Sequence, residues 1–147
     1  MAYKVFADAN VYLDLFLQRG NNWKDAEMMP DLSAQKEIEV FTSASTVLNL
    51  MYIMKTYGFA RQEIIKQSSS LLSFTTLVNP DNIIFNTALT SGFNDLEDAV
   101  QYFTAKNVAG VDYFITSNIK DFKKADATLP VVTPSHFMKM YKKNRAL

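Results

Sequence analysis

The stretch Tyr3-Lys4-Val5-Phe6-Ala7-Asp8-Ala9-Asn10 decides the fold, because a short apolar run is followed at once by an acid and an amide. Residues 3–7 have the pattern of a buried strand, and a helix is predicted over 11–17 with Asn10 as its N-cap. In open α/β sheets, the carboxyl ends of the strands share one edge, and ligands bind in the crevice there. Asp8 is therefore expected at a ligand-binding edge, although capping of the next helix by Asp8 or Asn10 is an alternative.

Strand and helix patterns alternate along the whole chain. Strands are predicted over residues 3–7, 38–42, 74–78, 113–116 and 130–133. Helices are predicted over 11–17, 23–36, 45–57, 60–72, 81–91, 95–106 and from Pro134 onward, with Pro30 breaking or kinking the second of them. Alternation of this kind favours a parallel sheet covered on both faces, and right-handed crossovers make it a three-layer α/β/α sandwich.

Composition narrows the class of protein. A chain of 147 residues that is 48% hydrophobic is expected to form one globular domain, residues 1–147. Its formal net charge of zero means that a nucleic acid would need a local basic patch. The absence of cysteine excludes disulfides, thiolate zinc sites and thiol nucleophiles. The N-terminus lacks a signal-peptide core, and no apolar run approaches the ~18 residues of a membrane span, so a cytoplasmic protein is expected.

The helix predicted over 95–106 carries a candidate functional acid. Asp95 and Asp98 share one stripe of this helix, beside its apolar face. Glu97 has a structural explanation, because Asn94 with an acid three residues later fits a capping box. Asp98 lies beyond that cap on the flank of the core, so it is the stronger functional candidate.

A second polar segment, Thr116-Ser117-Asn118 with Asp121, closes the strand over 113–116. Its alternative explanation is capping of a short turn over 119–124. Carboxylates gathered at one edge repel one another unless protons or a cation offset their charge, and the cation that suits oxygen ligands is Mg²⁺ or Mn²⁺. A zinc site of the ordinary type is not expected, because His136 is the single histidine.

Other polar residues are less informative. Asn49 lies in an apolar stretch and by itself would be read as a satisfied core amide. Asp14, within a nearly all-apolar helix, is either a partner of the site or a solvent-exposed residue. Lys120 and Lys123 adjoin Asn118 and are either solvated surface or phosphate contacts. No nucleotide-binding glycine motif is present.

With these segments in place, the chain resembles a PIN domain, the nuclease fold of VapC-type toxins. The resemblance lies in Phe6-Ala7-Asp8-Ala9-Asn10-Val11, in residues 93–102 around Asp98, and in residues 112–122 around Asn118. It implies a parallel sheet of four to five strands and a Mg²⁺- or Mn²⁺-dependent ribonuclease. It also implies a homodimer and the role of the toxin in a toxin–antitoxin pair, with RNA and an antitoxin protein as partners.

The family's acidic positions map onto this chain with one exception. The first matches Asp8, the third Asp98, and the fourth Asn118, with Asp121 close by. The second is generally a glutamate, and Asn49 stands there instead, as in one PIN subgroup. Ser117 stands where many members carry arginine.

The resemblance implies metal-assisted phosphodiester hydrolysis. The residues that it places at the catalytic centre are Asp8, Asp98, Asn118 and Asp95, with the metal held by Asp8 and Asp98 and completed by Asp95, Asn118 or Asp121. Asn10, Ser43, Asn49 and Thr116 would orient these ligands, and Lys120 and Lys123 would contact the substrate.

Two other functions remain open at this point. A catalytically weak PIN-like module that only binds RNA or an antitoxin would explain Asn49 equally well. A phosphatase of the haloacid-dehalogenase type also begins with an acid at a strand end, but it needs Asp-x-Asp, and Asp8-Ala9-Asn10 lacks the second acid.

Overall fold

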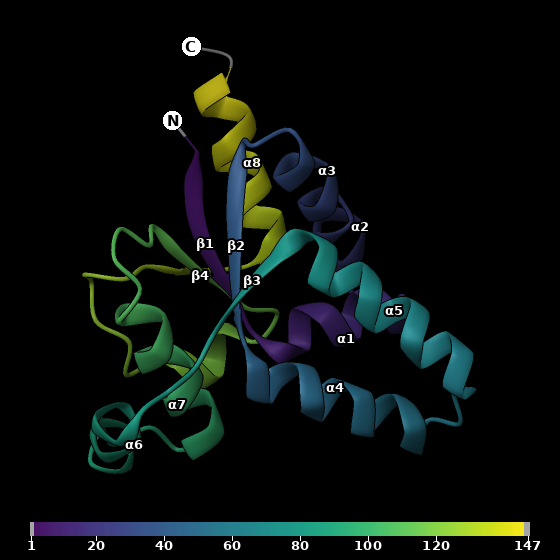
Figure 1. Cartoon of the computed structure of the whole chain (residues 1–147). Coiled ribbons are helices and arrows are strands. Elements are labelled where there is room, and N and C mark those ends of the chain that lie inside the picture. The colour runs from purple at the N-terminus through teal and green to yellow at the C-terminus, as the bar shows by residue number, and fades with distance from the viewer. Residues whose placement is uncertain (1, 146–147) are drawn as a thin grey trace.

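A three-layer sandwich is built around a parallel sheet (Figure 1), as described by a computed structural model that covers residues 2–145. The five strands of the sheet lie in the order β3-β2-β1-β4-β5, and each neighbouring pair is parallel. The strands are β1 (Tyr3–Ala7), β2 (Ile38–Ser43), β3 (Thr75–Val78), β4 (Tyr113–Ile115) and β5 (Val131–Val132). The predicted α/β/α architecture is therefore confirmed.

Helices cover both faces of this sheet. They are α1 (Ala9–Leu17), α2 (Trp23–Ala26), α3 (Met28–Ala34), α4 (Ala44–Thr56), α5 (Arg61–Phe74), α6 (Asn82–Leu89), α7 (Leu96–Lys106) and α8 (Pro134–Arg145), with a 3-10 turn η1 (Ile119–Phe122). In Figure 1, α6 and α7 lie on one side of the sheet and the remaining α-helices lie on the other. No helix within residues 2–145 combines the length and the apolar character that crossing a bilayer requires.

The central strand β1 shows why the first apolar run is buried on both sides. Val5 and Ala7 belong to the core cluster under α1, α4, α5 and α8. Phe6 points to the opposite face, where its ring stacks on Phe114 of β4 with the ring centroids 5.5 Å apart. Successive side chains of a strand alternate between faces, so a strand covered on both sides must be apolar throughout.

Helix α1 begins two residues earlier than expected. Asp8, rather than Asn10, is its N-cap, and the Asp8 carboxylate accepts hydrogen bonds from the backbone N–H groups of Asn10 at 3.1 Å and Val11 at 3.4 Å. The prediction of Asn10 as the cap was wrong because Asp8 already satisfies these donors at the end of β1.

The helix predicted over 23–36 is divided into α2 and α3. The break falls at Glu27, upstream of Pro30, and Pro30 is the third residue of α3. The first backbone N–H groups of a helix have no partner within it, so a proline costs little there. Pro30 therefore sits in the first turn of a new helix and does not interrupt an old one.

Candidate active site

The ends of β1 and β4 bring Asp8 and Thr116 together at the carboxyl edge of the sheet. The backbone N–H of Asp8 donates to the carbonyl of Ile115 at 3.1 Å, which continues the pairing of the two strands. The Thr116 hydroxyl donates to the Asp8 carboxylate at 2.6 Å, and both side chains are fully buried. The hydroxyl of Thr116 thus holds one oxygen of Asp8 in place.

Asp98 lies in the first turn of α7, with 8% of its surface exposed. The N-cap of this helix is Asp95, which accepts a hydrogen bond from the backbone N–H of Asp98 at 3.0 Å. The predicted capping box of Asn94 and Glu97 was wrong, because Asp95 has the capping geometry one residue later. Asp95 therefore has a structural role that fixes the start of the helix carrying Asp98.

Burial and mutual repulsion perturb both acids. Burial raises the pKa of Asp8 to about 7, against the hydrogen bonds that favour its charged form. The pKa of Asp98 is also raised to about 7, chiefly by burial and then by the negative charges of Asp95, Asp8, Asp121 and Glu97. The ion pairs formed within residues 2–145 include neither acid. The edge of the sheet therefore holds two acids whose negative charge has no protein cation beside it.

The loop after β4 is tied to the same edge through Thr116. The backbone N–H of Asn118 donates to the Thr116 hydroxyl at 3.1 Å, and the Asn118 amide donates to the Asp121 carboxylate at 2.5 Å. The Asn118 side chain makes no capping bond to η1, so the capping explanation does not apply to it. Its exposed side chain and that of Asp121 are held together beside the buried acids.

Asn49 stands in the family's second acidic position, and it is not the buried core amide that this residue alone would suggest. It is half-buried on α4, and its amide donates to the exposed Glu97 carboxylate of α7 at 3.2 Å. Glu97 therefore has a partner across the helix interface. Ser43, at the N-cap of α4, is buried and hydrogen-bonds the Ser45 hydroxyl at 2.7 Å.

Sequence reasoning missed Gln101, a buried residue of α7. Its side-chain oxygen accepts hydrogen bonds from the backbone N–H of Ala9 at 3.2 Å and from the Thr46 hydroxyl at 3.3 Å. Gln101 thereby joins α7 to the starts of α1 and α4. The sequence feature that could have indicated Gln101 is its position three residues after Asp98, on the same side of the helix.

Arg19 was also missed. It pairs with Asp14 at 2.8 Å, and both line a cavity of about 370 Å³ together with Asn10, Ser117 and Asn118. The left-handed backbone of Gln18, with φ of 50°, ends α1 and lets the chain turn back toward Asp14. The sequence signal was an acid in an apolar helix followed five residues later by an arginine.

The structure does not gather all the expected metal ligands into one cluster. Within residues 2–145, no group of three or more Asp, Glu, His or Cys side chains lies close enough to hold a metal ion. Asp8 and Asp98 form the inner pair, and Asn118 with Asp121 forms a second, exposed pair. Lys120 and Lys123 are exposed in and after η1.

Comparison with known proteins identifies the family to which this fold belongs. A family model described as PIN domain matches residues 4–120. No curated protein matches the chain. Among solved structures, PAE2754 from Pyrobaculum aerophilum superposes with a TM-score of 0.64 at 12% identity, covering 97% of this chain and 92% of that one.

Two further structures are similar at low identity. A toxin–antitoxin complex from Klebsiella pneumoniae gives a TM-score of 0.62 at 24% identity, covering 88% of this chain and 97% of that one. VapC20 from Mycobacterium tuberculosis, described as a sarcin–ricin loop cleaving toxin, gives 0.56 at 13% identity, covering 75% of this chain and 86% of that one. From the family match over most of its length, this chain belongs to the PIN domain family.

Proposed function

We propose that this PIN domain protein is a divalent-metal-dependent endoribonuclease and the toxin of a toxin–antitoxin pair. The observation that supports this most is the pair of buried acids, Asp8 and Asp98, at the carboxyl edge of a parallel sheet. Ligands of open α/β sheets bind at that edge. Structural relatives that are described as a toxin–antitoxin complex and as an RNA-cleaving toxin support the reaction and the partner.

The residues fit a hard cation. Both acids present oxygen donors, and each has its pKa raised to about 7 by burial and nearby negative charge. Mg²⁺ is commonly bound by one or two carboxylates together with water and substrate phosphate, so a cluster of three acids is not required. Either Mg²⁺ or Mn²⁺ suits this donor set.

In the proposed reaction, Asp8 and Asp98 would hold the metal, and the neighbouring polar groups would position these two acids. Thr116 keeps one Asp8 oxygen fixed through its 2.6 Å hydrogen bond. Asp95 fixes the first turn of α7, and Asn118 and Asp121, which are bonded to each other, would complete the ligand set directly or through water. When bound, the divalent ion supplies Lewis-acid chemistry that activates water and offsets charge on the phosphate.

Substrate phosphates would be held by cations of the surrounding surface, which do not pair with Asp8 or Asp98. Arg19 lines the cavity that also contains Ser117 and Asn118. It therefore offers a guanidinium close to the position where many PIN domains carry arginine and this chain has serine. Lys120 and Lys123, exposed in and after η1, extend the contact along the RNA backbone. RNA as substrate is consistent with action in the cytoplasm.

A homodimer is supported by an exposed apolar face. Phe85, Leu89 and Leu96 are 46%, 61% and 49% exposed, and they line one cavity between α6, α7 and α4. Large apolar side chains grouped on a surface mark an interaction site. Asn49 and Glu97 line the same cavity, so a second copy seated here would lie beside the acids.

The test is cleavage of a panel of structured RNAs by purified protein, followed against Mn²⁺ concentration. Asp8→Asn and Asp98→Asn should each abolish metal-dependent cleavage. The matched control is Asp81→Asn, because Asp81 caps α6 in the way that Asp8 caps α1. Cleavage that persists in Asp8→Asn would contradict the proposal. RNA binding without cleavage by the wild type would favour a binding module.

A further inference from the structure

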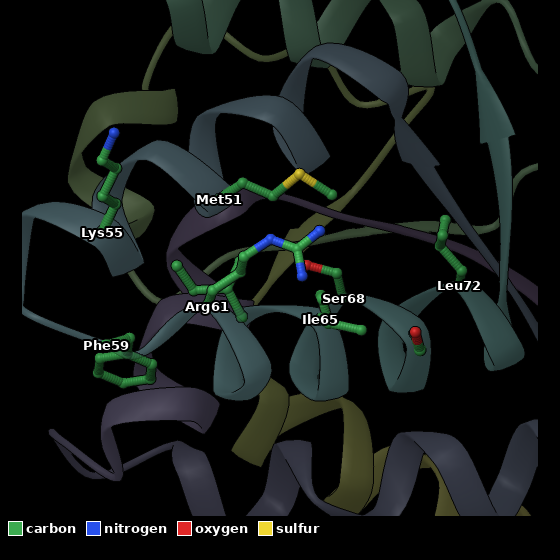
Figure 2. Close-up of a pocket in the computed structure, with 9 residues that line it drawn as sticks. Met51, Lys55, Phe59, Arg61, Ile65, Ser68 and Leu72 are labelled. Carbon is green, nitrogen blue, oxygen red and sulfur yellow. The ribbon is translucent and has the colours of Figure 1, made fainter.

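The cavity that contains Asp14 and Arg19 is lined entirely by polar side chains and by Gly20. It differs in this from the groove between α4 and α5, whose lining includes Met51 and Leu72 (Figure 2). A cavity of about 370 Å³ without an apolar wall offers no surface on which a nucleobase could stack or a partner's apolar side chains could pack. It suits a small polar group that makes hydrogen bonds, such as a sugar.

This cavity adjoins the proposed catalytic centre on two sides. Asn10 lines it, and the backbone N–H of Asn10 donates to the Asp8 carboxylate at 3.1 Å. Asn118 also lines it, and the backbone N–H of Asn118 donates to the hydroxyl of Thr116, which in turn donates to Asp8. An RNA strand whose scissile phosphate lies at Asp8 would therefore bring the sugar next to that phosphate toward the cavity.

Asp14 offers this cavity a charged acceptor that the protein leaves free. Its Oδ1 accepts a hydrogen bond from Arg19 Nε at 2.8 Å, and no hydrogen bond within residues 2–145 engages its Oδ2. The Asp14 side chain is 13% exposed, and Oδ2 is not one of the fully buried oxygens, so a ligand can reach it. Gly20 keeps this approach open, because a side chain there would begin 4.0 Å from Asp14 Oδ2.

The charges around Asp14 favour a neutral donor over a phosphate. The pKa of Asp8 is raised chiefly by burial and in smaller part by the charge of Asp14, so the two carboxylates lie within electrostatic reach of each other. A phosphate placed against Asp14 would be repelled, whereas a hydroxyl would donate to it. The 2′-hydroxyl of ribose is both a donor and an acceptor, and deoxyribose lacks it. The amide of Asn10, in the same cavity, is able to donate to that hydroxyl in turn.

We propose that this cavity is a ribose subsite, in which Asp14 accepts a hydrogen bond from a 2′-hydroxyl of the substrate and thereby makes the protein bind RNA in preference to DNA. Arg19 positions Asp14 through its Nε and leaves its other N–H groups for substrate phosphate. Metal-assisted hydrolysis of a phosphodiester does not require the 2′-hydroxyl, so a preference for RNA has to arise from contacts of this kind. The assignment rests on the proposed function, because it names the sugar that the same site recognises.

The affinities of three matched probes test the subsite. A fluorescein-labelled pool of short single strands with randomised bases is made as RNA, as DNA with deoxyuridine, and as 2′-fluoro RNA. Fluorescence anisotropy measures their binding to Asp98→Asn, which is expected to leave the probes uncleaved. RNA should bind about tenfold or more tightly than DNA, because the DNA complex lacks a hydrogen bond to a charged acceptor. 2′-Fluoro RNA keeps the sugar pucker of RNA but has no donor, so it should bind like DNA.

Further variants in the same Asp98→Asn background assign the preference to Asp14. Asp14→Ala should lower the affinity for RNA to that for DNA. Asp31→Ala is the matched control, because it removes the same charge from an exposed position of α3 outside the cavity and should keep the preference. Arg19→Gln loses the positive charge but keeps a donor for Asp14, so its affinities for RNA and DNA should fall together. A ratio of two affinities measured on one sample does not depend on the fraction of folded protein.

Three results would overturn the ribose subsite. They are RNA that binds no better than DNA or not at all, 2′-fluoro RNA that binds like RNA, and a preference for RNA that survives Asp14→Ala. Cleavage of RNA by the wild type with Mn²⁺ tests the nuclease function separately. Cleavage together with any of the three results contradicts the subsite alone, whereas a preference that depends on Asp14 without cleavage contradicts only the nuclease proposal.

Discussion

Asp8 and Asp98 make the stability of the unliganded protein depend on pH. The pKa of each rises from 3.8 to about 7 on folding, so between these values the folded chain holds protons that the unfolded chain has released. The free energy of unfolding therefore falls as pH rises from about 4 to about 7, and it changes little from these groups above that range. A divalent ion held by these acids, as proposed, would offset this penalty because it would bind their ionised forms.

We expect the melting temperature in EDTA to fall between pH 5 and pH 7.5, and the stabilisation by millimolar Mn²⁺ to grow over the same interval. Protons and metal compete for the same oxygens, so the metal effect is smallest in acid. Differential scanning fluorimetry measures both quantities. Asp98→Asn should flatten the pH dependence and reduce the Mn²⁺ effect. A Mn²⁺ shift of the same size at pH 5 and pH 8 would place the ion elsewhere.

The hydrogen bond between Asn49 and Glu97 predicts that an added negative charge at position 49 destabilises the protein only while Glu97 is also charged. Asn49→Glu sets two carboxylates where the amide now donates at 3.2 Å, so we expect a loss of about 1 kcal/mol in the free energy of unfolding in EDTA. Adding Glu97→Gln should restore it by exchanging donor and acceptor. Urea unfolding of the two single variants and the double variant measures this coupling. If the changes in unfolding free energy of the two single variants simply add up in the double variant, the contact contributes nothing to stability.

Sequence patterns predict which side chains come together most directly where strand ends determine their positions. Asp8 and Thr116 follow apolar strands, so sheet geometry alone brings them together. Asn49, Gln101 and Arg19 depend on how helices from distant parts of the chain pack or turn back, and no local pattern specifies that.

At the scale of elements, alternation of strand and helix patterns was enough to predict the sheet and its two covered faces. The boundaries were less accurate where several polar residues compete to cap a helix. In α1 and α7, the aspartate that caps is the one whose backbone is still extended, with ψ of 172° at Asp8 and 117° at Asp95. Sequence shows the candidates but not which of them keeps that conformation.

The cap of α1 allows the structural and chemical roles of Asp8 to be separated. Asparagine caps helices as well as aspartate does, whereas alanine loses about 1 kcal/mol. Asp8→Asn should therefore keep or raise the melting temperature, since it removes a buried charge, and should lose the Mn²⁺ effect. Asp8→Ala should lower the melting temperature and also lose the stabilisation by Mn²⁺. If Asp8→Asn unfolds the protein, the charge itself is structural.

At the scale of the whole molecule, the apolar face of α6 and α7 predicts self-association. Leu89→Glu adds a charge at the cavity shared with Phe85 and Leu96, so it should shift a dimer to monomer in sedimentation equilibrium. Leu89 is 61% exposed, and the melting temperature of the monomer should change little. Ile83→Glu on the same helix is the comparison, because Ile83 is exposed but does not line that cavity.

The hydrogen bond from Thr116 to Asp8 spans 108 residues of chain. During synthesis, β1 leaves the ribosome first but cannot pair with β4 until residues 113–115 have also emerged. Asp8 can therefore receive the Thr116 hydrogen bond only after the chain has been synthesised beyond residue 116. The carboxyl edge of the sheet is in consequence incomplete in any nascent chain from which β4 has not yet emerged.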